Sequence, residues 1–345
     1  YLNIGKTDLA MTLSTFTKEV RPAVENMLRE IIDTVDKRQF SGLHTMLSYH
    51  MGWEGEGAGG EASGKRIRPL LALLATSAVG KQWHDALPAA AAVELIHNFS
   101  LIHDDIEDQS DFRHGRKTVW SLWGEAQAIN TGDCMFSLAF QALGSARGTA
   151  ENILKALQNL QTTSVRLTGG QYLDMAYENQ SELPLDGYWK MVGGKTAALL
   201  ACSASIGPEL TGGDDNSISA LADFAWNLGL AFQAQDDWLG VWGDCAVIGK
   251  STNNDLKSGK KSLPILLGLK SSADFRKRWA MRPFTDDEIP ELSEILKKDG
   301  IDEIVEEETA RLTRQAKDAL QKVQPWNDYL DCLNELADKL LDRVK

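Results

Sequence analysis

Residues 101–118, LIHDDIEDQSDFRHGRKT, carry the strongest signal in this chain. Asp104, Asp105 and Asp108 come at the end of an apolar stretch whose spacing predicts a helix over 87–108. Because Asp104 and Asp108 are four residues apart, they share one face of that helix. Carboxylates at this spacing repel each other, and near a helix C-terminus they also oppose the helix dipole. The stretch therefore predicts a bound cation beside the helix end.

A second acidic cluster lies in residues 232–240, FQAQDDWLG, at the end of another apolar stretch. Asp236 and Asp237 close a helix predicted over 217–239, and Gln233 lies three residues earlier on the side of Asp236. Carboxylate oxygens suit a hard cation, and Mg²⁺ in proteins uses one or two carboxylates together with substrate phosphates. Closely spaced His and Cys for zinc, or Glu-x-x-His pairs for a di-iron centre, accompany neither cluster. Two such helix ends predict a shared Mg²⁺ site.

The rest of the chain predicts an all-α fold, a helical bundle around a deep central cavity. Helical periodicity recurs, and no alternating β-branched run stands between turn signals. We expect one domain over residues 1–345, with an acidic helical region at 285–345 whose residues 285–308 form a solvated face. Loops are expected at the Gly-rich residues 52–64 and at 244–261. Further helices are predicted over 14–36, 69–79, 122–146, 151–177, 188–205 and 303–323.

Composition excludes several classes of protein. The 345 residues include 36 Lys and Arg against 49 Asp and Glu, a net charge of −13, which argues against nucleic acid or an anionic membrane as partner. No apolar run is long enough for a membrane span, and no signal-peptide layout is present. The four cysteines are far apart in the sequence and form no C-x-x-C pair. We expect a cytoplasmic protein.

Basic residues in this acidic chain gather beside the two clusters. Residues 64–69, GKRIRP, follow the Gly-rich loop, Arg113 and His114 follow the first cluster, and Lys250 and Lys260 follow the second. Lys195-Thr196 opens another helix after two glycines. Metal-binding carboxylates next to Lys and Arg fit a polyanion such as diphosphate. The segment 59–65 is no nucleotide phosphate loop, because Arg66 stands where that motif needs Ser or Thr.

These motifs together resemble the trans-isoprenyl diphosphate synthase (polyprenyl synthetase) family over residues 60–265. Residues 104–108 match its first aspartate-rich motif, and residues 236–240 match the second except that Gly240 replaces the last Asp. The other matches are 64–69 to G-K-x-x-R-P, 170–174 to G-Q-x-x-D, 195–196 to K-T, and Gly249-Lys250, Asp255-Leu256 and Gly259-Lys260 to the loop after the second motif.

The resemblance implies a Mg²⁺-dependent prenyltransferase, usually a homodimer, that joins isopentenyl diphosphate to an allylic diphosphate. Asp104, Asp108 and Asp236 would bind Mg²⁺, with Asp105 and Asp237 in support. The allylic diphosphate would be held by Arg113, Lys195 and Lys260, and isopentenyl diphosphate by Lys65, Arg68 and His97. Lys250 is a further substrate-binding candidate, and Thr196 and Gln233 would stabilise the carbocation.

Two positions depart from the family pattern. His114 stands where a second Arg usually binds isopentenyl diphosphate, and His is charged only part of the time at pH 7. A terpene cyclase that ionises an allylic diphosphate alone therefore stays an alternative, as does a non-catalytic subunit of a heteromeric synthase, although the intact first motif argues against the latter. Gly240 removes one carboxylate, but Asp236, Asp237 and Asp244 remain, so we expect metal binding to survive.

Phe99 is the candidate for setting product length. It lies five residues before Asp104, about 7.5 Å deeper along the helix. In the family a bulky side chain here closes the cavity, so Phe99 with the small Ser100 is typical of short-chain (C15–C20) synthases, most like geranylgeranyl or farnesyl diphosphate synthases. A longer-chain product, with Phe99 as ordinary core, is the alternative.

Overall fold

The computed structural model describes residues 10–178, 180, 183–243 and 254–341. Contacts divide the chain into two compact units. Unit 1 comprises Tyr1–Gln161, Cys202–Ser219 and Val323–Glu335; unit 2 comprises Thr162–Ala201, Ala220–Lys322 and Leu336–Lys345. The single domain over residues 1–345 stays a prediction. In the described part of the chain, every helix is too short or too polar to cross a membrane.

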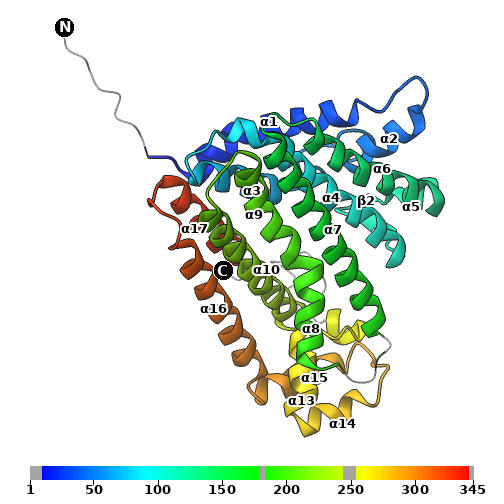
Figure 1. The fold of residues 1–345 in the computed structure, drawn as a ribbon. Helices are drawn as coiled ribbons and strands as arrows, with labels where there is room; N and C mark the ends of the chain where they lie inside the picture. The colour runs from blue at the N-terminus through cyan, green and yellow to red at the C-terminus, as the bar shows by residue number, and fades with distance from the viewer. Residues whose placement is uncertain (1–9, 179, 181–182, 244–253, 342–345) are drawn as a thin grey trace. The chain divides into compact units, whose positions relative to one another are not determined.

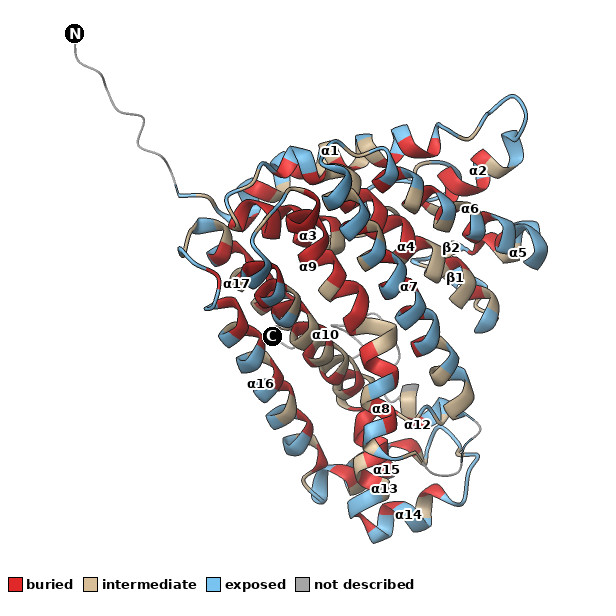
Figure 2. Ribbon diagram, viewed as in Figure 1, coloured by how far each residue is buried: buried red, intermediate tan, exposed pale blue. Residues whose placement is uncertain are grey.

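Helix α4 (Leu87–Glu107) forms the centre of unit 1 (Figure 1). Four consecutive alanines, residues 89–92, are fully buried in it, which lets neighbouring backbones come close. It packs against α1 (Leu13–Ile32), α3 (Ile67–Ala78) and, most extensively, α6 (Glu125–Gly144). The unit also contains α2 (Ser41–His50), the short helix η1 (Trp83–Ala86) and α5 (Val119–Trp123). Figure 2 shows α3 and much of α4 as buried, whereas in α5 only Leu122 and Trp123 are exposed.

A β-hairpin follows α4 directly and was not predicted. Its strands, β1 (Phe112–Arg113) and β2 (Arg116–Lys117), pair antiparallel with Arg113 opposite Arg116. His114 and Gly115 form the two-residue loop with φ of 50° and 75°, as a type I′ turn requires. Strands of two residues are too short to show the alternation by which a sequence reveals a strand.

Unit 2 is built around its own apolar cluster, which includes Tyr188, Leu256, Phe275, Leu292 and Val305. Its helices are α8 (Leu185–Val192), α12 (Asn254–Ser258), α13 (Leu263–Ser271), α14 (Ala273–Trp279), α15 (Ile289–Lys298) and α16 (Ile301–Leu320), with a π-helical turn, η2, at Gly193–Ala197. Residues of both units belong to α7 (Ala150–Glu178), α9 (Ala198–Leu210), α10 (Asp215–Trp242) and α17 (Asp328–Leu341).

The predicted all-α class is confirmed, with β1 and β2 the only strands among the described residues. The helix expected over 122–146 is divided at Gly124, where φ is 84°, and the one over 188–205 is interrupted by η2. The loop expected over 244–261 is wrong at α12, and its residues 244–253 lie outside the described part. The acidic residues 285–308 include α15 and the start of α16, whose Leu292 and Val305 are buried, so this region has an apolar face as well.

Candidate functional site

The three aspartates at the end of α4 occupy different environments. Asp105 is 2% exposed, and its Oδ1 accepts hydrogen bonds from Nε and Nη2 of Arg113 at 2.8 and 2.7 Å. Asp104 is half-buried and Asp108 is exposed. Burial raises the pKa of Asp105 against the opposing effect of Arg113. Asp105 therefore anchors Arg113, while Asp104 and Asp108, one helical turn apart, are placed where a ligand can reach them.

The hairpin sets the position of Arg113 and His114. Arg113 lies in β1 beside the turn, which brings its guanidinium back to Asp105 on α4. His114 is exposed at the tip, in a left-handed conformation in which His is more common than most residues.

Residues 64–69 lead into α3 in unit 1, which begins at Ile67. Lys65 is exposed, whereas Arg66 is buried with φ of 51°. The Arg66 guanidinium donates to Glu25 and Glu94, both at 2.8 Å, and to the carbonyl oxygen of Met51 at 3.3 Å. Arg66 thus holds the backbone of the motif in place between Lys65 and Arg68, whose side chains are more exposed.

Arg68 has the environment of an anion-binding residue. Its Nε is buried without a hydrogen-bond partner among the described residues. Burial lowers the pKa of Arg68, and only the charge of Glu94 opposes this effect. A buried N–H without a hydrogen-bond partner is costly, so an anionic ligand that accepts from Nε would be stabilising.

The Gly-rich residues 52–64 form a series of turns held by Arg116. Its guanidinium donates to the carbonyl oxygens of Tyr49, Glu54 and Glu56 at 2.8, 2.7 and 2.9 Å, and it lies over the Tyr49 ring. A side chain at Gly55 would come within 2.7 Å of that ring. Arg116 therefore shapes the loop that leads into Lys65.

His97 and Phe99 are two residues apart on α4 but have different surroundings. Burial, and then the charges of Arg68 and Arg113, lower the pKa of His97 well below its usual value. Phe99 makes edge-to-face contacts with His103 and Phe136, at centroid distances of 4.9 and 5.1 Å. Its ring therefore packs toward α6, as expected of a side chain that lines the product cavity.

In unit 2, the buried Asp237 holds three neighbouring groups in place through hydrogen bonds. Its carboxylate accepts hydrogen bonds from the hydroxyl of Tyr188 at 2.6 Å, the backbone N–H of Leu263 at 2.8 Å and the amide of Gln233 at 2.9 Å. Burial raises the pKa of Asp237 to about 6. The Thr196 hydroxyl donates to Gln233 Oε1 at 3.1 Å. This chain of bonds fixes the orientation of the Gln233 amide, and nothing in the sequence marks Tyr188 for its part in it.

The motifs at residues 170–174 and 195–196 contact each other in unit 2 through glycine backbone. A Cβ on Gly170 would lie 2.1 Å from the backbone nitrogen of Lys195, and one on Gly194 would lie 2.7 Å from the carbonyl oxygen of Arg166. The backbones of α7 and η2 thus touch. This contact places Asp174 Oδ2 2.6 Å from Nζ of Lys195. π-Helical turns of this kind are frequent at functional sites.

Asp236, Asp255 and Lys260 complete the group in unit 2. Burial lowers the pKa of Lys260, but Asp237, Asp255, Asp174 and Asp236 outweigh that effect and raise it. Glycine at position 240 is explained by steric hindrance, because a Cβ there would lie 2.6 Å from Oδ2 of Asp255. The carboxylate of Asp255 therefore occupies the space beside the position where the resemblance led us to expect an Asp.

A paired substitution tests the contact between the two motifs. We expect Gly170→Ala to abolish most activity and to lower the melting temperature, because the added methyl group meets backbone that cannot rotate away. Gly169→Ala is the matched control, since a Cβ there meets nothing within 4 Å. Thermal unfolding and steady-state kinetics measure both effects. Equal behaviour of the two variants would show that α7 and η2 are not in close contact.

Neither unit contains a complete metal-binding site made of protein side chains alone, as far as the described residues go. No three of their His, Cys, Asp or Glu side chains converge as a metal site. Lys250 and Asp244 lie outside the described residues. The predicted roles of the site residues stay predictions.

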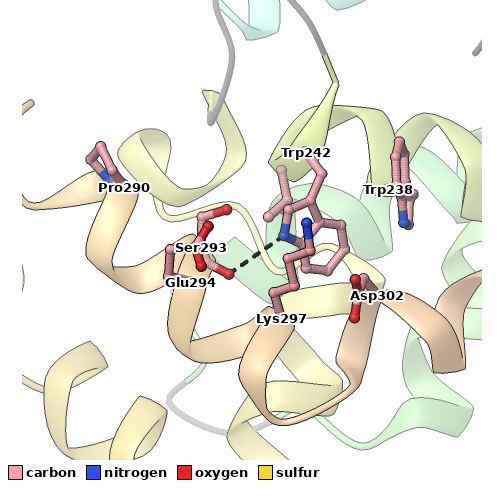
Figure 3. A pocket seen from close by; sticks show the side chains of 8 residues that line it. Trp238, Trp242, Pro290, Ser293, Glu294, Lys297 and Asp302 are labelled. Atoms are coloured by element: carbon pink, nitrogen blue, oxygen red, sulfur yellow. Dashed lines mark hydrogen bonds between the residues drawn. The ribbon is translucent and has the colours of Figure 1, made fainter.

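A cavity of about 380 Å³ lies elsewhere in unit 2, among α10, α15 and α16 (Figure 3). Trp242 Nε1 donates to the carbonyl oxygen of Ser293 at 3.4 Å at its edge. None of the predicted site residues lines it. Its lining consists of Trp238, Val241, Trp242, Pro290, Ser293, Glu294, Lys297 and Asp302.

Comparisons with known proteins agree with these motifs. The family model described as polyprenyl synthetase matches residues 60–296. A (2E,6E)-farnesyl diphosphate synthase of Mycobacterium bovis is 35% identical over 326 residues, 92% of this chain and 89% of that protein. A geranylgeranyl diphosphate synthase of Mycobacterium tuberculosis is 41% identical over 234 residues, 67% of each chain. The crystal structure of a polyprenyl synthetase from Streptomyces coelicolor has a TM-score of 0.85 and 34% identity, covering 95% of this chain and 99% of that one.

Proposed function

The chain belongs to the polyprenyl synthetase family and is a trans-prenyltransferase, and from this premise we propose that it condenses isopentenyl diphosphate with an allylic diphosphate to a C15–C20 trans-prenyl diphosphate. The observation that carries the proposal is the arrangement at the end of α4 in unit 1, where Arg113 is held against the buried Asp105 while Asp104 and Asp108 stay accessible. A guanidinium beside accessible carboxylates suits a diphosphate bound together with a divalent cation. The relatives from the two Mycobacterium species are synthases of C15 and C20 products, which supports the short-chain range.

In unit 1 we assign Lys65, Arg68 and His97 to the diphosphate of isopentenyl diphosphate. The unpartnered Nε of Arg68 supports this assignment, because a phosphate oxygen would satisfy it. His114 lies exposed at the hairpin tip, where it can take the place of the family's second Arg only in its protonated state. Arg113, Lys195 and Lys260 are assigned to the allylic diphosphate.

Asp104, Asp108 and Asp236 are the proposed Mg²⁺ ligands. The donor set fits, because Mg²⁺ prefers oxygen ligands and completes its shell with substrate phosphates and water rather than with three or more protein side chains. When bound, Mg²⁺ would neutralise the charge that develops on the leaving diphosphate. Asp105 and Asp237 support these ligands by fixing Arg113 and Gln233.

The protein side chains act mainly through electrostatics. As the allylic C–O bond breaks, Arg113, Lys195 and Lys260 stabilise the departing diphosphate. The oxygens of Thr196 and Gln233, oriented by their mutual bond and by Asp237, stabilise the carbocation. The double bond of isopentenyl diphosphate attacks the cation, and the proton then lost goes to the departing diphosphate. No step requires a side-chain nucleophile.

Product analysis tests the proposal. Purified protein is incubated with Mg²⁺, isopentenyl diphosphate and geranyl diphosphate, and the products are separated by chromatography. We expect C15 or C20 diphosphates. Release of diphosphate from geranyl diphosphate alone, with a cyclised hydrocarbon and no elongation, would overturn the proposal in favour of a terpene cyclase. Longer products would correct only the chain length.

A homodimer is proposed as the assembly. The exposed fractions of Leu122 and Ile129 are 43% and 45%, and Trp123 between them is 37% exposed, all on α5 and α6 of unit 1. Large apolar side chains exposed to this extent support a protein–protein interface here. Light scattering measures the assembly directly. A cytoplasmic location stays a prediction.

Phe99→Ala is expected to lengthen the product by one or more isoprene units. The substitution removes the ring that packs against Phe136 and His103 and opens space along α4. Phe140→Ala is the control, because Phe140 contacts Phe136 in the same aromatic row. Product chromatography distinguishes the two. An unchanged distribution for Phe99→Ala, or an equal shift in both variants, would show that Phe99 does not limit chain length.

A further inference from the structure

The cavity among α10, α15 and α16 contains none of the proposed diphosphate-binding residues, yet its size suits a small ligand. Its volume of about 380 Å³ lies in the range of small-molecule pockets. All of its lining residues belong to unit 2. The ring centroids of Trp238 and Trp242 are 5.8 Å apart, and the two rings are tilted by 46° (Figure 3). The two indoles form an apolar corner against which a ligand can pack.

Two buried polar atoms of the cavity lining lack a hydrogen-bond partner among the described residues. They are Nε1 of Trp238, a donor, and Oδ1 of Asp302, an acceptor. Trp242 differs, because its Nε1 donates to the carbonyl oxygen of Ser293 at 3.4 Å. A buried polar group without a partner is costly. A ligand that accepts from Trp238 and donates to Asp302 would therefore be stabilised, and neither atom has to give up an existing hydrogen bond to turn toward it.

The charges of the lining favour a cation. Glu294 and Lys297 are exposed on α15 and carry opposite charges, so they cancel at the rim. Asp302, in the first turn of α16, adds a further negative charge. An acid in the first turn suits the helix dipole, but the dipole does not explain why one of its oxygens is buried without a partner. Asp302 therefore decides the sign of charge that the cavity prefers.

We propose that this cavity binds a small organic ammonium compound that also carries an oxygen acceptor, as the amino alcohols do. The ammonium group donates to Asp302, and the oxygen accepts from Nε1 of Trp238. The carbon skeleton packs on the indole faces, which also attract a cation. A metal ion fits less well, because it would leave the indole N–H without an acceptor. This site goes beyond the proposed transferase activity and does not depend on it.

Helix α10 separates the cavity from the metal ligand proposed on the same helix. Trp238 and Trp242 are four residues apart and share one face of α10. Asp236 is two residues before Trp238, about 200° around the helix, and therefore lies on the opposite face. We expect the ammonium compound and a diphosphate to bind at the same time rather than to compete.

Nuclear magnetic resonance on the full chain with isotope-labelled tryptophan tests the inference. The probe is phenylalaninol, which has an ammonium group, a hydroxyl group and an apolar ring, and the Trp238 indole signal is identified by its loss in Trp238→Phe. We expect saturable shifts of the Trp238 and Trp242 signals and none for Trp83, which belongs to unit 1. N-acetylphenylalaninol lacks the charge and should bind about tenfold or more weakly.

Variants separate the two recognition groups. Asp302→Asn keeps the shape of the side chain but loses its charge, so phenylalaninol should bind about tenfold or more weakly. Glu303→Gln is the matched control, because it removes the neighbouring acid of the same helical turn, which is exposed and outside the lining, and it should bind like the unaltered protein. Trp238→Phe, followed through Trp242, should weaken phenylalaninol about threefold or more but phenethylamine, which lacks the hydroxyl group, less than about twofold.

Three results would overturn the proposal. An absence of saturable shifts would show that the cavity holds solvent only. Equal affinity for phenylalaninol and its acetylated form, or equal affinity of Asp302→Asn and Glu303→Gln, would exclude recognition of a cation by Asp302. Displacement of phenylalaninol by inorganic diphosphate with Mg²⁺ would place the probe in the diphosphate site instead of this cavity.

Discussion

Asp104→Asn is expected to lower kcat for chain elongation by about 100- to 1000-fold while the protein stays folded. Asp104 and Asp108 lie one turn apart at the end of α4, where the backbone N–H of Asp108 donates to the carbonyl oxygen of Asp104 at 2.8 Å. Asn keeps the shape of the side chain but loses its charge, so a divalent ion is held less well and the leaving diphosphate is less stabilised. Steady-state kinetics at saturating substrates measure the loss.

Controls on the same helices sharpen this prediction. Glu107→Gln removes an exposed carboxylate from α4 between Asp104 and Asp108, and it should keep kcat within about threefold. In unit 2, Asp236→Asn should resemble Asp104→Asn, and the exposed Asp223→Asn, also on α10, should resemble Glu107→Gln. Full activity of Asp104→Asn would contradict the assignment of Asp104 as a metal ligand.

Arg66→Met is expected to destabilise unit 1 by about 3–5 kcal/mol. Arg66 is buried and neutralises Glu94, of which only 4% is exposed, as well as Glu25. Met fills a similar volume but leaves the Glu94 carboxylate buried without its cation, which is the costly half of a broken ion pair. Denaturant unfolding followed by circular dichroism measures the change.

The neighbouring residue provides the control for Arg66. Lys65→Met also removes one positive charge from the same motif, but Lys65 is exposed, so its stability should change by less than about 0.5 kcal/mol. Its KM for isopentenyl diphosphate should rise instead. Equal stability of the two variants would contradict the view that Arg66 is structural and Lys65 functional.

Helical spacing predicted most of the helices that carry the site, since α3, α4, α7 and α10 all bury an apolar face. The acidic clusters were predicted for a similar reason, because carboxylates four residues apart on a helix can be recognised from their spacing in the sequence. The roles within a cluster were given only by resemblance. Asp104 and Asp105 are adjacent and chemically identical, and the structure distinguishes them by the burial of Asp105 and by the hairpin that returns Arg113 to it.

Contacts distant in sequence were beyond prediction. Gly240 and Asp255 are separated by residues outside the described part, yet the carboxylate of one lies against the backbone of the other. Tyr188 also stands alone in the sequence, and its part in the site arises from its hydrogen bond to Asp237, which belongs to another helix. A lone Tyr or Gly carries no spacing signal, so tertiary packing alone reveals its role.

The most direct test of the central claim is the affinity for inorganic diphosphate, measured by calorimetry with saturating Mg²⁺ and again with EDTA. If Asp104, Asp108 and Asp236 hold the diphosphate through divalent ions, Mg²⁺ should strengthen binding by about 100-fold or more, and Asp104→Asn and Asp236→Asn should each remove most of that gain. Equal affinity with and without Mg²⁺, or an undiminished Mg²⁺ effect in both variants, would contradict the claim.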